Sequence, residues 1–409
     1  MPKNKRIAVL GAGGLGACLA LELAQRGYQV TLFEAHSEAV RKASFVNEGK
    51  IHLGFIYAMD RDFHTSQQMI IGAVHFMDYL KRWISIEAEE VISTPFHYCI
   101  HKGSLASGDQ LEPHYAQCAQ VFGEVSRRFD KKYLGLFDKV YTERLPKSKI
   151  ETIVNPEYFE DVFLTSEYAV EPRAVAEQLR KSLGQEAAIQ LLTGAWVKAV
   201  VRREGRLEVR FDQNGLEHRD SFDEVVNCTW NSLLAIDQTL GIEPLHGSWS
   251  FRYKFGNKIL IPFEASDFPS CTMVQGPFGD SVNFRDRGGF FSWYPIGRTG
   301  WSEERLPPDW DGTYSPEYRE EIFQASFEQL RHRVPALRSL SFPAESVDPA
   351  GGVIFALGNT DVEDADSKLH TRHEVGIRSF DGYHTVNTGK YTLIPYLAVK
   401  TADRLEGIS

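Results

Sequence analysis

Cysteines are few in this sequence and show no pairing pattern. The five cysteines, Cys18, Cys99, Cys118, Cys228 and Cys271, are odd in number, and no two are spaced as Cys-x-x-Cys. Disulfide-rich domains carry an even set, and zinc sites use closely spaced pairs. The sequence therefore argues against a disulfide framework and predicts no metal site. Because unpaired cysteines are typical of a reducing compartment, we expect a cytoplasmic location.

Long apolar stretches are also missing. No segment approaches the roughly 20 apolar residues that a transmembrane helix needs. The apolar run from Ile7 to Leu10 is shorter than the core of a secretory signal, which spans roughly 7–15 residues. We therefore expect no transmembrane segment and no secretory leader.

Positive charge is in deficit. The chain has 45 lysines plus arginines against 55 acidic residues, which gives a formal net charge of -10. Proteins that bind nucleic acid or anionic membranes generally present a basic patch or run. No such run is present, so we expect no nucleic-acid partner.

The N-terminal sequence has the order strand, helix, strand. Residues 6–10 and 28–33 are short apolar runs that predict strands, and residues 15–27 have helical spacing of apolar residues. The turn that opens the helix carries the pattern GxGxxG, formed by Gly11, Gly13, Gly14 and Gly16. In a βαβ unit these glycines allow a tight turn, a close approach of backbone to a pyrophosphate and close helix packing.

Glu34 ends the second predicted strand, about 20 residues after the glycine loop. An acidic residue there accepts hydrogen bonds from the ribose of a dinucleotide and repels the 2′-phosphate of NADP. The N-terminal unit therefore predicts a dinucleotide site. The loop alone leaves FAD and NAD open.

The rest of the chain predicts a mixed α/β fold. Further helices are expected at about 66–83, 172–184 and 316–334 and from Pro395, strands at 207–211 and 225–226, and a hairpin turn at Asn214-Gly215. Thr65 to Gln68 has the pattern of a capping box for the helix at 66–83. The α/β pattern at both ends encloses a middle rich in aromatic residues and short β runs, about 236–300.

Three further segments carry a family resemblance. They are residues 47–54 (Asn-Glu-Gly-Lys-Ile-His-Leu-Gly), residues 168–173 with the later Val197 and 225–229, and residues 387–395 (Asn-Thr-Gly-Lys-Tyr-Thr-Leu-Ile-Pro). Together they resemble the D-amino-acid oxidase superfamily of FAD-dependent oxidoreductases, nearest to its branch containing L-2-hydroxyglutarate oxidase and glycerol-3-phosphate dehydrogenase. The resemblance implies FAD rather than NAD. At one position it departs, because Trp230 stands where the family usually has glycine.

The glycine loop and the resemblance together imply a set of FAD-binding residues. The set is Gly11, Gly13, Gly14, Gly16, Glu34, Ala35, Ser44, Asn47, Gly49, Lys50, Ile51, Val197, Thr229, Gly389, Lys390, Tyr391 and Thr392. The segment at 387–395 resembles a turn that closes over the isoalloxazine and begins the last helix, so we expect it to meet His52 and its neighbours at that ring. N–H groups at a helix start, together with a lysine, suit the electron-rich N1/C2 carbonyl end of a reduced flavin.

The expected catalytic residues are His52, Lys390, Arg372 and Tyr294. A histidine titrates near neutrality and accepts a proton when an alcohol is oxidised, and residue 52 lies in the segment that lines the flavin by resemblance. Arginine is the natural clamp for a carboxylate or phosphate, and Arg252, Arg285 and Arg298 are further candidates. Tyr57 and Tyr253 are alternative pocket hydroxyls, and His370 is expected beside Arg372.

We therefore expect an α/β protein with a Rossmann-type FAD-binding domain and an interleaved β-rich substrate domain. The predicted FAD-binding domain comprises residues 1–75, 150–235 and 346–409, and the substrate domain comprises residues 76–149 and 236–345. The expected function is oxidation of a CH–OH or CH–NH bond of a small polar substrate by hydride transfer to flavin N5, with an unidentified electron acceptor. The alternatives are an NAD-dependent dehydrogenase and a non-catalytic FAD-binding protein.

Overall fold

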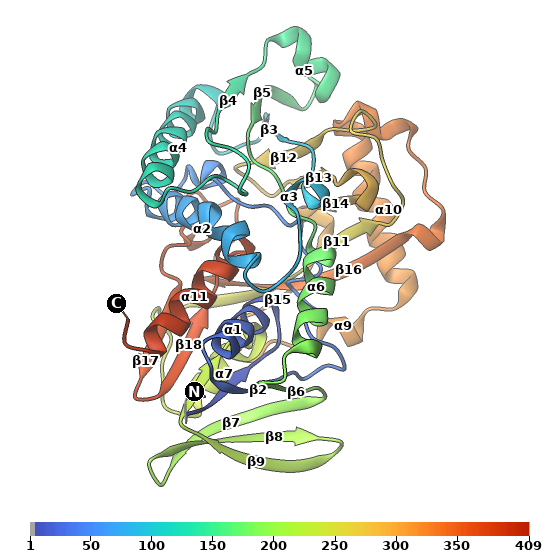
Figure 1. Cartoon of the computed structure of the whole chain (residues 1–409). Helices are drawn as coiled ribbons and strands as arrows, with labels where there is room; N and C mark the ends of the chain where they lie inside the picture. Colours follow the sequence, from blue (N-terminus) through green and yellow to red (C-terminus); the bar gives the residue numbers. More distant parts are fainter. Residues whose placement is uncertain (1–4, 409) are drawn as a thin grey trace.

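A computed structural model describes residues 5–408 and contains three sheets (Figure 1). The first has six strands in the order β17 (Gly376–Phe380), β18 (Tyr383–Asn387), β10 (Glu224–Asn227), β1 (Arg6–Leu10), β2 (Gln29–Phe33) and β6 (Ile189–Leu192). All neighbours pair in parallel except β17, which is antiparallel to β18. Strands from both ends of the chain therefore lie in one layer.

The second sheet has nine strands and supplies most of the β-rich part of the molecule. Its path is β15 (Arg298–Ser302), β11 (Trp249–Ile259), β14 (Gly289–Trp293), β13 (Gly279–Asn283), β12 (Ser270–Val274), β3 (Phe96–His101), β5 (Phe159–Thr165) and β4 (Thr142–Arg144), with β16 (Val347–Leu357) on β11. A third, antiparallel sheet consists of β7 (Ala195–Arg203), β8 (Arg206–Gln213) and β9 (Leu216–Phe222).

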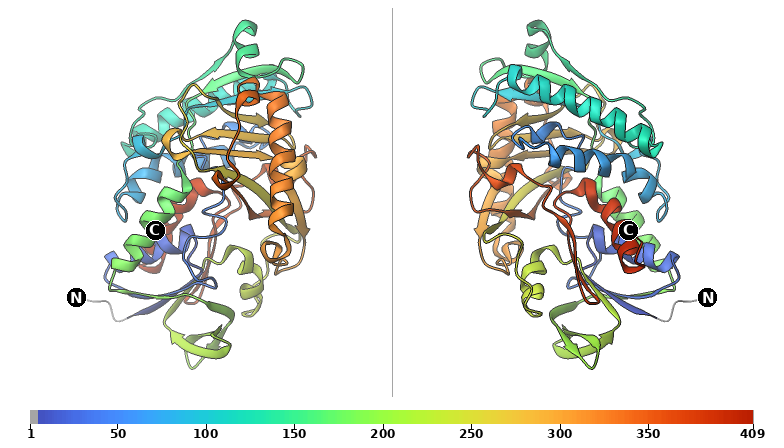
Figure 2. Two further views of the ribbon diagram at one scale, coloured as in Figure 1. Left: turned by 90° about the vertical axis from the view of Figure 1, so that its right-hand side faces the viewer. Right: turned by 90° about the vertical axis from the view of Figure 1, so that its left-hand side faces the viewer.

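The helices cover the sheets from several sides. They are α1 (Gly14–Gln25), α2 (His64–Leu80), α3 (Ala88–Val91), α4 (Gly108–Phe129), α5 (Lys147–Ile153), α6 (Pro172–Gln185), α7 (Leu233–Gln238), α8 (Tyr294–Gly297), α9 (Trp310–Thr313), α10 (Pro316–Arg333) and α11 (Ile394–Leu405). In Figure 2, α2 and α4 lie on one side of the nine-stranded sheet and α10 lies on the other. Helix α11 packs against α1 and α2 and so joins the C-terminus to the N-terminal unit.

The predicted elements are largely confirmed. The N-terminal βαβ unit, the helices α6 and α10 and the last helix appear within a few residues of their expected bounds. At the hairpin turn, Asn214 and Gly215 both have positive φ, as a two-residue turn between β8 and β9 requires. The α/β fold class is therefore confirmed.

The capping box expected at Thr65 is wrong. Helix α2 begins at His64, two residues before the expected start, and has no side-chain cap at its start. The Thr65 N–H donates to Asp60 Oδ2 at 2.8 Å, and its hydroxyl accepts the backbone N–H of Arg372 at 2.8 Å. Tertiary contacts therefore replace the local cap.

Two strands of the predicted FAD-binding domain pair with strands of the predicted substrate domain. Strands β5 and β16 lie in ranges assigned to the FAD-binding domain, yet both pair in the nine-stranded sheet. The division into two domains stays a prediction.

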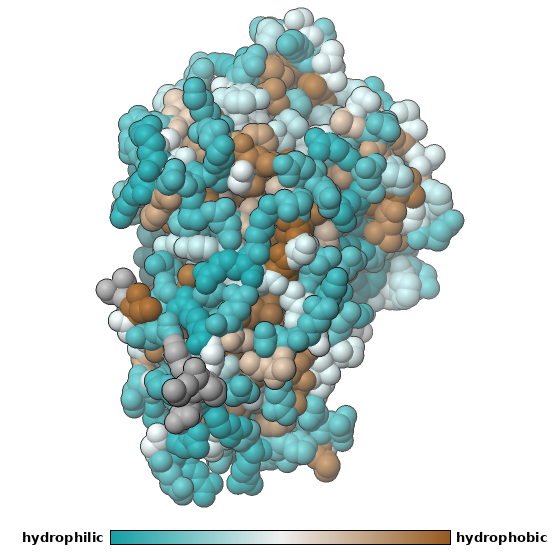
Figure 3. All heavy atoms as spheres, in the orientation of Figure 1, coloured by the Kyte–Doolittle hydropathy of each residue, from teal (hydrophilic) through white to brown (hydrophobic). Residues whose placement is uncertain are grey.

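The surface is mainly hydrophilic on the face that Figure 3 shows. No helix within residues 5–408 is long and apolar enough to cross a membrane.

Candidate active site

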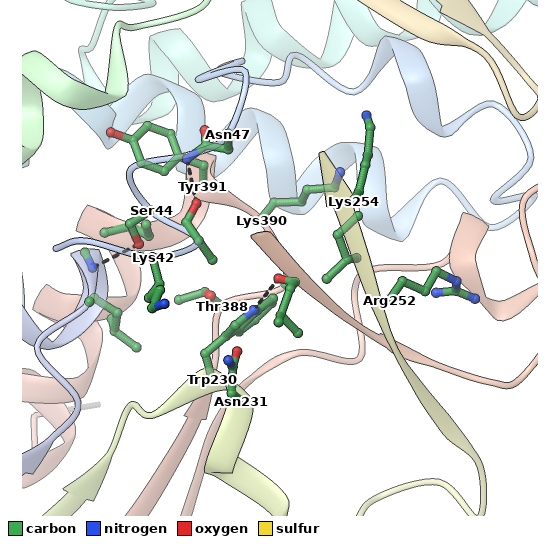
Figure 4. A pocket seen from close by; sticks show the side chains of 18 of the residues that line it. Lys42, Ser44, Asn47, Trp230, Asn231, Arg252, Lys254, Thr388, Lys390 and Tyr391 are labelled. Carbon is green, nitrogen blue, oxygen red and sulfur yellow. Dashed lines mark hydrogen bonds between the residues drawn. The ribbon is translucent and has the colours of Figure 1, made fainter. Parts of the chain in front are cut away.

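A cavity of about 480 Å³ runs between the six-stranded and nine-stranded sheets. Sixteen residues of the expected FAD-binding and catalytic sets line it: Gly11, Gly13, Gly14, Glu34, Ala35, Ser44, Asn47, Lys50, His52, Val197, Thr229, Tyr294, Arg372, Gly389, Lys390 and Tyr391. Figure 4 shows Lys42, Ser44 and Asn47 on one side of the cavity and Arg252 and Lys254 on the other, with Lys390 between them. The structure thus joins segments from both ends and the middle of the chain around one space.

The glycine loop forms one end of the cavity. Gly11 has φ of +89°, which favours glycine, and the N–H of Gly14 donates to Ser44 Oγ at 3.0 Å. A side-chain carbon added at Gly13 has no neighbour closer than Ser44 Oγ at 3.9 Å, so its backbone is open to the cavity. A carbon added at Gly16 meets the carbonyl oxygen of Gly11 at 1.9 Å. Gly16 therefore serves helix packing, as expected, and does not line the cavity.

Glu34 lies beside this loop and is held by it. Its Oε2 accepts the N–H of Ala12 at 3.0 Å, and its Oε1 accepts the N–H of His36 at 2.9 Å. Burial raises the pKa of Glu34, although these N–H groups and Lys42 favour the charged form. Each carboxylate oxygen has a second lone pair, which remains suited to a ribose hydroxyl.

Trp230 has a backbone conformation that favours glycine. Its φ is +58°, a left-handed value that a bulky residue rarely adopts and that costs on the order of 1–3 kcal/mol. The indole Nε1 donates to the carbonyl oxygen of Val353 in β16 at 2.8 Å. The neighbouring Thr229 lines the cavity, and its hydroxyl donates to Asn227 Oδ1 at 2.7 Å. The tryptophan therefore links this turn to β16 through a hydrogen bond that glycine could not form.

The two segments expected to converge do meet. Thr392 Oγ1 accepts the backbone N–H of His52 at 2.9 Å and lies 3.2 Å from the carbonyl oxygen of Lys50, to which it donates. Gly49, Ile51 and Thr392 do not line the cavity, unlike the other members of the implied FAD set in these segments. Gly49 has positive φ and packs against Val170, and Ile51 and Thr392 are fully buried. These three residues hold the cavity wall in place.

His52 faces the cavity and is paired with a buried carboxylate. Its Nδ1 lies 3.4 Å from Glu167 Oε1, and Glu167 also accepts the phenol of Tyr98 at 2.6 Å and the N–H of Leu53 at 2.7 Å. Burial lowers the pKa of His52, although Glu167 opposes that shift. His52 Nδ1 forms no hydrogen bond within residues 5–408, so Glu167 acts on the imidazole through its charge. A neutral imidazole beside a carboxylate is suited to accept a proton near neutral pH.

Further charged groups gather around His52. We call the part of the cavity lined by Lys50, His52, Tyr57, Arg252, Lys254, Asp280, Tyr294, Arg372 and Lys390 the polar end. Burial lowers the pKa of Lys390 to about 8, opposed by Glu48. Burial lowers the pKa of Arg372 to about 10, and its Nη1 donates to the carbonyl oxygen of Phe355 at 3.1 Å.

The remaining candidates differ in their placement. Tyr294 lines the cavity and donates its hydroxyl to Asp361 Oδ1 at 2.7 Å, and His370 also lines the cavity. Tyr57 lines it with a buried hydroxyl that has no hydrogen-bond partner among residues 5–408. Tyr253, whose hydroxyl is bound to Asp311, and Arg285 do not line it.

Three charged residues at or behind the polar end were not predicted: Glu167, Lys254 and Asp280. Lys254 lies two positions after Arg252 in β11, and residues two apart in a strand share one face. The sequence therefore did contain a sign that Lys254 lies beside Arg252. The sequence gave no sign of the role of Glu167, because its partners Tyr98 and Leu53 are distant in sequence.

Among residues 5–408 no cluster of three or more His, Cys, Asp or Glu side chains is placed to hold a metal ion.

The residues of this cavity fit FAD. The open backbone at Gly13 and the helix start at Gly14 suit a pyrophosphate, while Val197 and the Glu34 carboxylate suit an adenosine. The polar end offers cations and a histidine beyond the dinucleotide loop, where a reactive ring and a substrate would meet. Fold and site together define a dinucleotide-dependent oxidoreductase.

The chain belongs to the DAO family of FAD-dependent oxidoreductases, whose model matches residues 6–368. FAD is therefore its cofactor. The resemblance at the level of this family is confirmed, and the particular branch is not decided by the family match.

Solved structures and one curated protein are also similar. Glycine oxidase from Geobacillus kaustophilus has a TM-score of 0.66 at 14% identity, covering 99% of this chain and 96% of that chain. FAD-bound L-α-glycerophosphate oxidase from Mycoplasma pneumoniae has a TM-score of 0.64 at 13% identity, covering 98% and 94%. The FAD-dependent monooxygenase FPY4 of Fusarium mangiferae is 28% identical over 106 residues, and this chain spans only 28% of its length. The structural matches, at these identities, show a shared fold.

Proposed function

We propose that this protein uses FAD to oxidise a CH–OH or CH–NH bond of a small substrate that carries one carboxylate. The observation that carries the proposal is a single cavity that extends from the glycine loop to the His52–Glu167 pair, Arg372 and Lys390. When bound, FAD supplies the hydride acceptor of this chemistry. The chain's own residues then have to bind the substrate, orient it and remove a proton.

Arg372 is the group that binds the substrate carboxylate in this proposal. Its side chain is 93% buried and lines the cavity, and its Nε has no hydrogen-bond partner among residues 5–408. A buried guanidinium with a free donor pairs strongly with a carboxylate, because charge-assisted hydrogen bonds gain strength where water is excluded. The hydroxyl of Tyr57, also unpartnered, supplies a second donor at the same end.

His52 accepts the proton of the substrate hydroxyl or amine. Glu167 stabilises the charge of the imidazole after proton transfer, as an adjacent carboxylate does for other catalytic histidines. Lys390 supplies a positive charge at the same end of the cavity, where negative charge develops.

The His52–Glu167 pair favours CH–OH over CH–NH oxidation, because an alcohol needs a base and a neutral amine does not. This agrees with the resemblance of residues 47–54 to the L-2-hydroxyglutarate oxidase and glycerol-3-phosphate dehydrogenase branch, which we retain as a proposal. CH–NH oxidation is the second candidate, since the similar structures include a glycine oxidase and an L-amino acid deaminase by name.

An anaerobic screen tests the proposal. The FAD-loaded protein is mixed with 2-hydroxy acids, amino acids, amines and neutral sugars, and the loss of visible flavin absorbance is followed. We expect bleaching by a hydroxy or amino acid and none by the matched neutral alcohol or amine. Bleaching by neutral compounds alone would contradict the role of Arg372, and bleaching by none would favour a non-catalytic FAD-binding protein.

Two further parts of the expectation remain proposals. We propose that electrons leave to an external acceptor, which oxygen consumption under air would identify as O₂. We also propose a cytoplasmic location and no nucleic-acid partner, which the five buried, free cysteines and the net charge of -10 support.

A further inference from the structure

Most cations of the polar end already face a carboxylate of the chain. Lys50 Nζ lies 3.0 Å from Asp280 Oδ1, and Lys254 Nζ lies 3.9 Å from Asp280 Oδ2. Burial alone would raise the pKa of Asp280, but these two lysines hold it below its usual range. Asp280 is therefore charged and offsets one of the two lysine charges.

Arg252 also faces a carboxylate, Asp361, which lies behind the cavity wall and which it shares with Arg298. Its Nε lies 3.4 Å from Asp361 Oδ1, and the Nε of Arg298 lies 3.2 Å from Asp361 Oδ2. The hydroxyl of Tyr294 and the N–H of Val362 both donate to Asp361 Oδ1, at 2.7 and 2.8 Å. Asp361 does not itself line the cavity, whereas Arg252 and Tyr294 do.

Arg252 has donor capacity left over. Its side chain is 99% buried, its Nη2 donates to the carbonyl oxygen of Thr360 at 2.8 Å, and its Nη1 has no hydrogen-bond partner among residues 5–408. Arg252 would thus be a second anion-binding group if Asp361 did not offset its charge. Arg372, by contrast, forms no ion pair with any carboxylate of residues 5–408, and its pKa is influenced mainly by burial and then by Tyr57.

We propose that Asp361 is a specificity-determining residue that restricts the substrate to a single anionic group. It does so by offsetting one of the two charges of Arg252 and Arg298, which leaves Arg372 as the arginine of the polar end that has no carboxylate partner among residues 5–408. The proposal rests on the proposed function, because it assumes that a carboxylate binds at the polar end. It adds that a substrate with a second carboxylate binds less well, although the buried Arg252 lies in the same cavity wall.

The test compares butyrate and succinate, which have four carbons each and differ by one carboxylate. Their dissociation constants are measured from the change in the visible flavin spectrum of the FAD-loaded protein, without turnover. We expect the native protein to prefer butyrate. We expect Asp361→Asn to shift the ratio of the two constants toward succinate by about tenfold or more, the size of one charge-assisted hydrogen bond.

Asp366→Asn is the matched control, since it removes one charge from the same loop at a side chain that is 89% exposed. It should leave the ratio unchanged. An unchanged ratio in Asp361→Asn, in protein that retains FAD and binds butyrate normally, would overturn the proposal. So would an equal shift in the Asp366→Asn control.

A second variant covers the case in which Asp361→Asn does not fold. Arg252→Gln should leave butyrate binding within about twofold of native, whereas Arg372→Gln should weaken it by about tenfold or more. Equal losses of butyrate binding in the two variants would show that Asp361 does not offset the charge of Arg252. That result would overturn the role of Asp361, while the proposed binding of one carboxylate would stand. If neither ligand binds native protein and Arg372→Gln changes nothing, the proposed function fails as well.

Discussion

At the scale of single residues, His52 and Glu167 carry the proposed proton transfer. Burial lowers the pKa of His52 below its ordinary value near 6.5, so the neutral base prevails at pH 7. The rate of flavin reduction should therefore fall only as the pH drops through this lowered pKa. We expect His52→Gln to reduce the rate by about 10²- to 10⁴-fold and to remove the acid limb.

Glu167→Gln provides the paired measurement. Because Glu167 raises the pKa of His52, its removal should move the acid limb to lower pH. Stopped-flow reduction between about pH 5 and pH 8 measures both variants. An acid limb that stays in place in both would assign it to a different group.

Lys390 should produce a limb on the alkaline side. Its pKa is lowered from 10.5 to about 8 by burial, so it is protonated below that value and loses its charge as the pH rises through it. The rate of flavin reduction should decline above about pH 8 in native protein. Lys390→Arg keeps the charge and should abolish this decline, while Lys390→Ala should slow reduction at every pH below 8. If Lys390→Ala changes neither the visible spectrum nor the rate, this residue does not act at the flavin.

At the scale of elements, the βα turn separates two roles for glycine. Gly16→Ala places a carbon 1.9 Å from the Gly11 carbonyl oxygen, so β1 and α1 must move apart. We expect a clear loss of thermal stability together with loss of FAD. Gly13→Ala meets no close atom in the chain and has φ of -69°, so the fold should keep its melting temperature while FAD binds more weakly. Equal melting temperatures in the two variants would contradict this separation.

The same elements explain what the sequence could and could not predict. The glycine loop, α1 and Glu34 are close in sequence and follow local rules, so their placement was predictable. Glu167 depends on a hydrogen bond from Leu53, 114 positions away, and a single sequence carries no sign of that pairing. The sequence also did not predict that β5 and β16 pair in the nine-stranded sheet, because tertiary packing decides which strands are partners.

At the scale of the whole molecule, the chain closes on itself around the cavity. Thr392, which precedes α11, receives the N–H of His52 across 340 positions and so fixes the segment that carries the base. Family resemblance at 47–54 and 387–395 predicted this meeting, and the hydrogen bond confirms it. Two chain ends that are packed in this way build a site that neither could form alone.

The most direct test of the account is the flavin content of the purified protein. Acid release followed by chromatography should yield about one FAD per chain, and the protein should be yellow before release, because the glycine loop, Glu34 and the C-terminal turn form one FAD cavity. Flavin that stays with the precipitate would still indicate FAD, attached covalently. A colourless protein that takes up NAD and not added FAD would contradict the account.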